Sequence, residues 1–136
     1  MKIKKFNLNK ISKQFKEAWK AKDIETIDNF VMRAAKFDGK YHWHKHDYED
    51  ELFIVFEGKI KIQTRNGDII LNKGEGVKIP SGLGHCPVSL KPSIVLMFEP
   101  LKLKRKGRVT DISDTFGELK RKVSGQKFKE MARSGW

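Results

Sequence analysis

The sequence has little of several features that mark particular classes of protein. Its single cysteine, Cys86, excludes an intramolecular disulfide and favours a reducing compartment. Its apolar runs, such as residues 94–98, are far shorter than the roughly 20 residues that cross a bilayer. The basic N-terminus lacks the apolar stretch of a secretory signal peptide. We therefore expect a cytoplasmic protein without a membrane segment.

Acidic residues are scarce at both ends of the chain, which has a net charge of +12. Residues 1–38 contain ten Lys or Arg against five Asp or Glu, residues 39–100 eight against eight, and residues 101–136 eleven against four. The basic residues after Pro100 could contact nucleic-acid phosphates. However, lysine predominates and few aromatic residues are interleaved, which is more typical of a solvated surface. Nucleic-acid contact is therefore the weakest of three functional hypotheses.

Turn-forming pairs such as Asp38-Gly39 and Asn66-Gly67 divide the chain after about residue 22. The segments between them are rich in Ile, Val, Phe and Tyr. They comprise residues 30–37, 40–46, 52–56, 59–65, 68–71, 76–79 and 93–99. Short, evenly spaced strands predict an all-β sandwich or barrel. The composition of residues 30–37 also permits a helix.

The two ends of the chain have helical patterns instead. Apolar residues recur at spacings of three and four over residues 8–20, which predicts a short amphipathic helix. Residues 116–136 show a weaker helical periodicity. We expect an N-terminal helical segment at residues 1–21, a β-barrel at 22–100, and a basic, partly helical C-terminal extension at 101–136.

The four histidines lie in two places, with His42, His44 and His46 in one and His85 in the other. On a strand, alternate residues share a face, so the first three would present their imidazoles together. Glu51 opens an apolar segment, where an inward carboxylate is costly unless it has a partner. One divalent metal ion (Fe, Mn, Ni, Zn or Cu) would account for both features. A solvated polar face, with Glu51 paired to a lysine, is the alternative.

The spacing of these residues resembles the two signatures of the cupin superfamily, and specifically its small single-domain, cupin 2-like metal-binding proteins. The first signature is matched by Gly39, His44, His46, Glu51 and Gly58, and the second by Gly74, Pro80, Gly82 and His85. Two departures occur: four rather than five residues separate Gly39 from His44, and Ser89 stands where asparagine is frequent. The resemblance implies a double-stranded β-helix, a jelly-roll barrel, with His44, His46, Glu51 and His85 binding the metal in its mouth.

The resemblance also implies a small polar organic molecule as substrate or ligand. An enzyme of this kind would be a metal-dependent oxygenase, isomerase or lyase, and the alternative is a non-catalytic binding or sensing module. Beside the ligands, His42 and Tyr41 are the candidates for a catalytic role, although a histidine at the barrel rim is the simpler interpretation of His42. We expect Cys86 to be a buried thiol facing away from His85.

The segment that follows Glu51 also predicts an interface. Phe53 and Val55 share the face of Glu51 and should line the cavity. Leu52, Ile54 and Phe56 point the opposite way and form an outer apolar face that a partner could cover. We therefore expect a homodimer.

Overall fold

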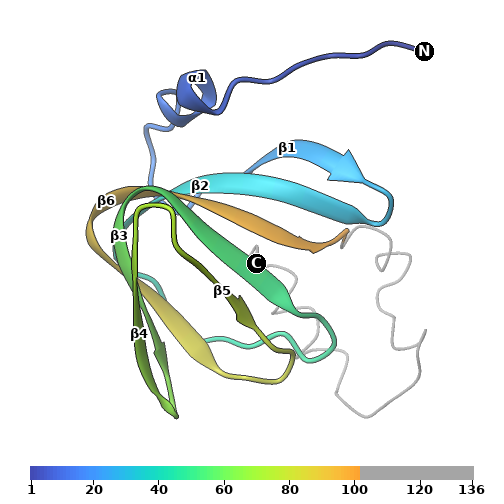
Figure 1. Ribbon diagram of the computed structural model, residues 1–136. Helices are drawn as coiled ribbons and strands as arrows, with labels where there is room; N and C mark the ends of the chain where they lie inside the picture. The colour runs from blue at the N-terminus through green and yellow to red at the C-terminus, as the bar shows by residue number, and fades with distance from the viewer. Residues whose placement is uncertain (102–136) are drawn as a thin grey trace.

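Strands make up most of the chain between residues 22 and 100. The computed structural model describes residues 1–101, so nearly all of the expected C-terminal extension lies outside the described residues. The elements are α1 (Leu8–Ser12), β1 (Lys22–Ile27), β2 (Phe30–Lys40), β3 (Glu51–Thr64), β4 (Gly67–Asn72), β5 (Gly76–Ile79) and β6 (His85–Pro100) (Figure 1). Among residues 1–101, no helix is long and apolar enough to cross a membrane.

The strands form one antiparallel system that folds over on itself. Their order is β1-β2-β6-β3-β4, and β5 pairs with β3. The first half of β3 pairs with the last half of β6, and the second half of β3 pairs with the first half of β6. Both strands curve between these halves, as Figure 1 shows, and so contribute to both layers of the barrel. This is the jelly-roll barrel that the sequence predicts.

Gly58 allows β3 to bend between the two layers. The register with β6 shifts on both sides of Glu57 and again after Lys59. Gly58 has a φ of +102°, and a Cβ atom at this position would collide with the side chain and backbone of Ser93 on β6. The Oγ atom of Ser93 accepts a hydrogen bond from the backbone N–H of Lys59 (2.9 Å). The two strands therefore touch at the bend, where only glycine fits.

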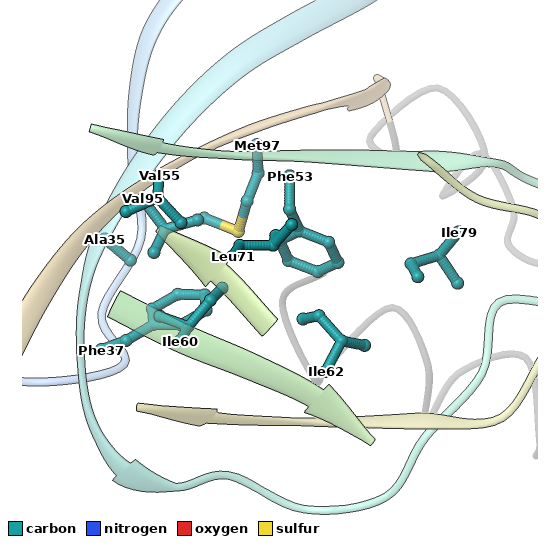
Figure 2. Close-up of a cluster of buried hydrophobic side chains, with 10 residues drawn as sticks. All are labelled: Ala35, Phe37, Phe53, Val55, Ile60, Ile62, Leu71, Ile79, Val95 and Met97. Carbon is teal, nitrogen blue, oxygen red and sulfur yellow. The ribbon is translucent and has the colours of Figure 1, made fainter. Parts of the chain in front are cut away.

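The interior is filled by side chains from alternate strand positions. One cluster contains ten buried apolar residues: Ala35, Phe37, Phe53, Val55, Ile60, Ile62, Leu71, Ile79, Val95 and Met97 (Figure 2). Phe53 and Val55 lie on the same face of β3 as Glu51, as predicted, and all three are buried. Alternation therefore continues from the apolar core to the carboxylate at the start of the strand.

Several strand predictions are confirmed, and others need correction. Residues 30–37 lie in β2, so the helical alternative is wrong. Residues 52–56 and 59–65 belong largely to one long strand, β3, joined through Gly58. β6 begins at His85, eight residues before the predicted start at Ser93. β1 was not predicted as a strand, because most of its residues are exposed and several are charged.

The N-terminal helix is shorter than predicted. It ends at Ser12 rather than near Lys20, and the side chain of Asn7 caps its start. Trp19 has a φ of +65°, its backbone N–H donates to the carbonyl oxygen of Lys36 (2.7 Å), and its ring packs against Phe37. These contacts with β2 cannot be made from a helix continued through Trp19. Tertiary packing therefore overrides the helical pattern.

Candidate metal centre

The histidines are brought together by backbone hydrogen bonds between two distant segments. The backbones of His44 and His85 form a two-way bridge, in which each N–H donates to the other's carbonyl oxygen (3.0 and 2.9 Å). Gly82 donates its N–H to the carbonyl oxygen of His46 (2.7 Å). Glu51 is the first residue of β3, next to β5. The segment after β2 is thus fastened to the start of β6 at the open end of the barrel.

Four side chains converge at this place: His44, His46, Glu51 and His85. One donor atom from each lies within 4.8 Å of all the others. The Oε1 atom of Glu51 is 3.1 Å from Nε2 of His46 and 3.8 Å from Nε2 of His85. His46, Glu51 and His85 are buried and His44 is partly buried. The cluster therefore contains the four residues that the cupin resemblance implies.

Backbone contacts fix the tautomers of two imidazoles. Nδ1 of His44 lies 3.0 Å from the carbonyl oxygen of His42, and Nδ1 of His85 lies 2.9 Å from that of Leu83. A carbonyl oxygen only accepts, so each Nδ1 carries the proton and donates it. Each Nε2 therefore directs a lone pair into the cluster, which is the arrangement that a metal-binding imidazole requires.

The protonation state of His44 fits the same role. Burial lowers the pKa of His44 to about 3, and the neighbouring His85 contributes to this shift. His44 is consequently neutral at physiological pH and has a lone pair available. Three imidazole nitrogens and one carboxylate suit Fe(II), Mn(II), Ni(II), Zn(II) or Cu(II), and this donor number leaves coordination sites for a further ligand. The residues present thus fit a divalent metal ion.

His42 does not join the cluster. Residues 41–46 are not a regular strand, since β2 ends at Lys40 and only the bridge at His44 follows. The predicted strand over residues 40–46 is therefore wrong beyond Lys40, although the His42 ring still lies 5.4 Å from that of His44, centroid to centroid. The imidazole of His42 is exposed and lies 3.9 Å from the Tyr41 ring, centroid to centroid. It is a histidine at the rim of the barrel mouth.

Tyr41 lies beside the cluster. Its ring stacks on Trp19 (4.7 Å between centroids) and meets His44 edge to face (5.5 Å). Burial raises the pKa of the Tyr41 hydroxyl, and the charge of Glu51 raises it further. The hydroxyl therefore keeps its proton at neutral pH.

Cys86 is a buried thiol, as predicted. It follows His85 on β6, so alternation turns it to the opposite face. Burial raises the pKa of Cys86, which keeps the thiol protonated and unreactive.

Sequence reasoning missed a second group of ionic side chains near the mouth. Arg33 on β2 contacts Glu99 on β6, with Nη1 2.9 Å from Oε2. Its Nε atom is 2.8 Å from Oδ1 of Asp23 on β1. Glu99 shares the parity of the core residues Val95 and Met97, and this parity was the available signal that its side chain points inward.

Comparisons with known proteins agree with this fold. The family model described as "Cupin domain" matches residues 31–99. The YdbB protein of Bacillus subtilis (strain 168) is 35% identical over 80 residues, which cover 58% of this chain and 71% of that protein.

Two solved structures extend the comparison. A cupin-2 domain containing protein from Shewanella frigidimarina is 31% identical, with a TM-score of 0.69, over 71% of this chain and 94% of that one. Protein NMB1881 from Neisseria meningitidis is 25% identical, with a TM-score of 0.66, over 72% of this chain and 100% of that one. By its sequence signatures, its barrel and these matches, the chain belongs to the cupin family.

Proposed function

We propose that the protein binds one divalent metal ion through His44, His46, Glu51 and His85, and that the site binds and converts a small polar organic molecule. The observation that carries this proposal is that three imidazoles and the Glu51 carboxylate converge on one largely buried site. Without a cation, the Nε2 lone pairs of His44 and His85 and the charge of Glu51 would be directed into the same buried site.

The residues around the ligands would have distinct roles. A bound metal would supply Lewis-acid polarisation or O₂ activation at its open coordination sites. Phe53 supplies an apolar wall, since its ring centroid lies 6.1 Å from that of His85. The Tyr41 hydroxyl would orient a polar group of the substrate by donating a hydrogen bond. His42, at the exposed rim, would be the first side chain that an entering molecule meets.

A non-catalytic binding or sensing module is the second candidate. The observation in its favour is that His42, one of the two residues proposed for catalysis, lies outside the cluster. A metal-bound ligand would then be held without being converted.

Metal titration of the purified, chelator-treated protein tests the metal site. We expect one equivalent of Zn(II) or Mn(II) to bind, and a protein that binds neither would contradict the proposal. Turnover of a small polar compound that is lost on chelation and restored by metal would support the enzyme. Saturable binding without turnover would support the binding module.

Three expectations remain predictions. The homodimer and the cytoplasmic location are compatible with the barrel but rest on sequence patterns. Nucleic-acid contact through the basic residues after Pro100 falls outside the described residues.

A further inference from the structure

Another buried glutamate, Glu99, lies on β6, which pairs with the start of β3. Leu52 of β3 pairs with Phe98 of β6 in antiparallel register. Glu51 precedes Leu52 and Glu99 follows Phe98, so continuing this register by one position would set the two glutamates opposite each other on the inner face. Both are buried, with 1% and 2% of their surface exposed. Opposed residues on one face have Cβ atoms about 4.5–5.5 Å apart.

Arg33 reaches Glu99 from the next strand. Its Nη1 atom is 2.9 Å from Oε2 of Glu99, and its side chain is only 20% exposed. Its Nε atom contacts Asp23 at the edge of the sheet (2.8 Å), so the guanidinium is fixed between two strands. A charge-assisted contact of this length in a buried place is strong, and removing one partner is costly.

The two carboxylates therefore have different neighbours, a guanidinium for Glu99 and imidazoles for Glu51. Ionised carboxylates this close repel each other unless each is compensated. Arg33 contacts Glu99, whereas the carboxylate of Glu51 lies near the imidazoles of His46 and His85. A second carboxylate among the ligands would change the donor set from three nitrogens and one oxygen to three nitrogens and two oxygens. More oxygen donors favour harder ions such as Mn(II).

We propose that Arg33 is a positioning residue that holds Glu99 away from the metal, so that Glu51 is the only carboxylate ligand. This inference rests on the proposed metal site. It names the side chain that decides which of two neighbouring glutamates binds the ion, and with it the preference of the site among divalent metals.

A rescue experiment tests this role, with Mn(II) as the probe and free Mn(II) measured by electron paramagnetic resonance. Glu51→Gln should weaken Mn(II) binding about tenfold or more, because it removes the carboxylate ligand while Arg33 still holds Glu99. Adding Arg33→Met should release Glu99 and recover about fivefold or more of that loss. The matched control adds Glu99→Gln to this double variant and should abolish the recovery.

The outcomes separate this inference from the metal site itself. Failure of the wild-type protein to bind metal would remove both proposals. One equivalent bound by the wild-type protein, without recovery in a double variant that retains its circular dichroism spectrum, would overturn only the role of Arg33.

The Glu99→Gln variant covers the case in which Arg33→Met does not fold. Its amide can still contact Arg33, so the barrel should persist. We expect its Mn(II) affinity to stay within about twofold of the wild-type value, because Glu99 is not a ligand. A loss of about tenfold would show that Glu99 already binds the metal, and would refute the role of Arg33.

Discussion

At the scale of the residue, the histidine side chains are oriented before any metal arrives. His44 and His85 each use Nδ1 to donate to a backbone carbonyl, and their backbones are bridged to each other. Rotating either ring away from the site would break its Nδ1 hydrogen bond. A fixed ring loses little conformational entropy when it binds, which favours metal affinity.

The exposed and buried histidines should consequently respond differently to substitution. We predict that His85→Ala abolishes stoichiometric metal binding, because it removes a nitrogen donor that no nearby side chain replaces. His42→Ala is the matched control, since it removes an imidazole only a few residues from the ligands and outside the cluster. The His42→Ala variant should still bind one equivalent of metal. Calorimetric titration measures metal binding by both variants. Equal losses of metal affinity in His85→Ala and His42→Ala would contradict the assigned ligands.

At the scale of the element, the bend of β3 decides whether the barrel closes. Glu51 begins the half of β3 that faces β5, and Thr64 ends the half that pairs with His85. A straight strand would place these two ends far apart, on one flat sheet. The bend at Gly58 therefore brings Glu51 and His85 to the same end of the barrel.

We predict that Gly58→Ala lowers the free energy of unfolding by about 3 kcal/mol or more, because it combines a left-handed φ with a collision against Ser93. Gly67→Ala provides the control, since Gly67 also has a positive φ (+118°) but open space around it. It should cost only about 1–2 kcal/mol. Urea unfolding measures both variants, and equal costs would show that close packing at the bend contributes nothing.

At the scale of the whole molecule, metal binding should stabilise the barrel. The ligands come from the start of β3, the start of β6 and the segment between β2 and β3, so unfolding destroys the site. A metal concentration 100 times the Kd should add about 2.7 kcal/mol to the free energy of unfolding. Thermal unfolding with and without a chelator measures this effect. An unchanged Tm in the wild-type protein would argue against binding to the folded state.

The outer face of β3 leads to a prediction about assembly. Leu52, Ile54 and Phe56 are partly exposed on the face opposite Glu51. We predict a dimer in sedimentation experiments at micromolar concentration, and a shift to monomer in Ile54→Lys, where the new charge would be buried at the interface. Ile70→Lys is the control, because Ile70 is exposed on β4 (44%) and should tolerate lysine. A monomeric wild-type protein would refute the homodimer.

The described barrel ends with a hydrogen bond from the N–H of Leu101 to the carbonyl oxygen of Asn29 (2.9 Å). All four proposed ligands precede this point. We therefore predict that a chain truncated after Pro100 retains metal binding and loses about 1–3 kcal/mol of stability. Metal stoichiometry and thermal unfolding of the truncated and full-length chains test this. A metal-free or unfolded truncation would show that the C-terminal residues belong to the functional domain.

The sequence alone determined the fold family and the grouping of His44, His46, Glu51 and His85. The all-β class follows from local features, because glycines, prolines and alternating apolar residues act on their own neighbourhood of the chain. The spacing of the two cupin signatures then supplied the long-range pairing of His85 with the other ligands. Strand boundaries were less predictable, as in β1, where exposed charged residues hide an edge strand.

Tertiary structure alone decided which side chains face each other across strands. The Arg33–Glu99 contact joins residues 66 positions apart, and no local pattern specifies a partner at that separation. The same holds for Trp19, whose contacts with β2 end the helical pattern of the N-terminal segment. His42 stays outside the metal-binding cluster, although its ring lies only 5.4 Å from that of His44. The register between distant strands is set by packing of the whole barrel, so it cannot be read directly from the residues of one sequence.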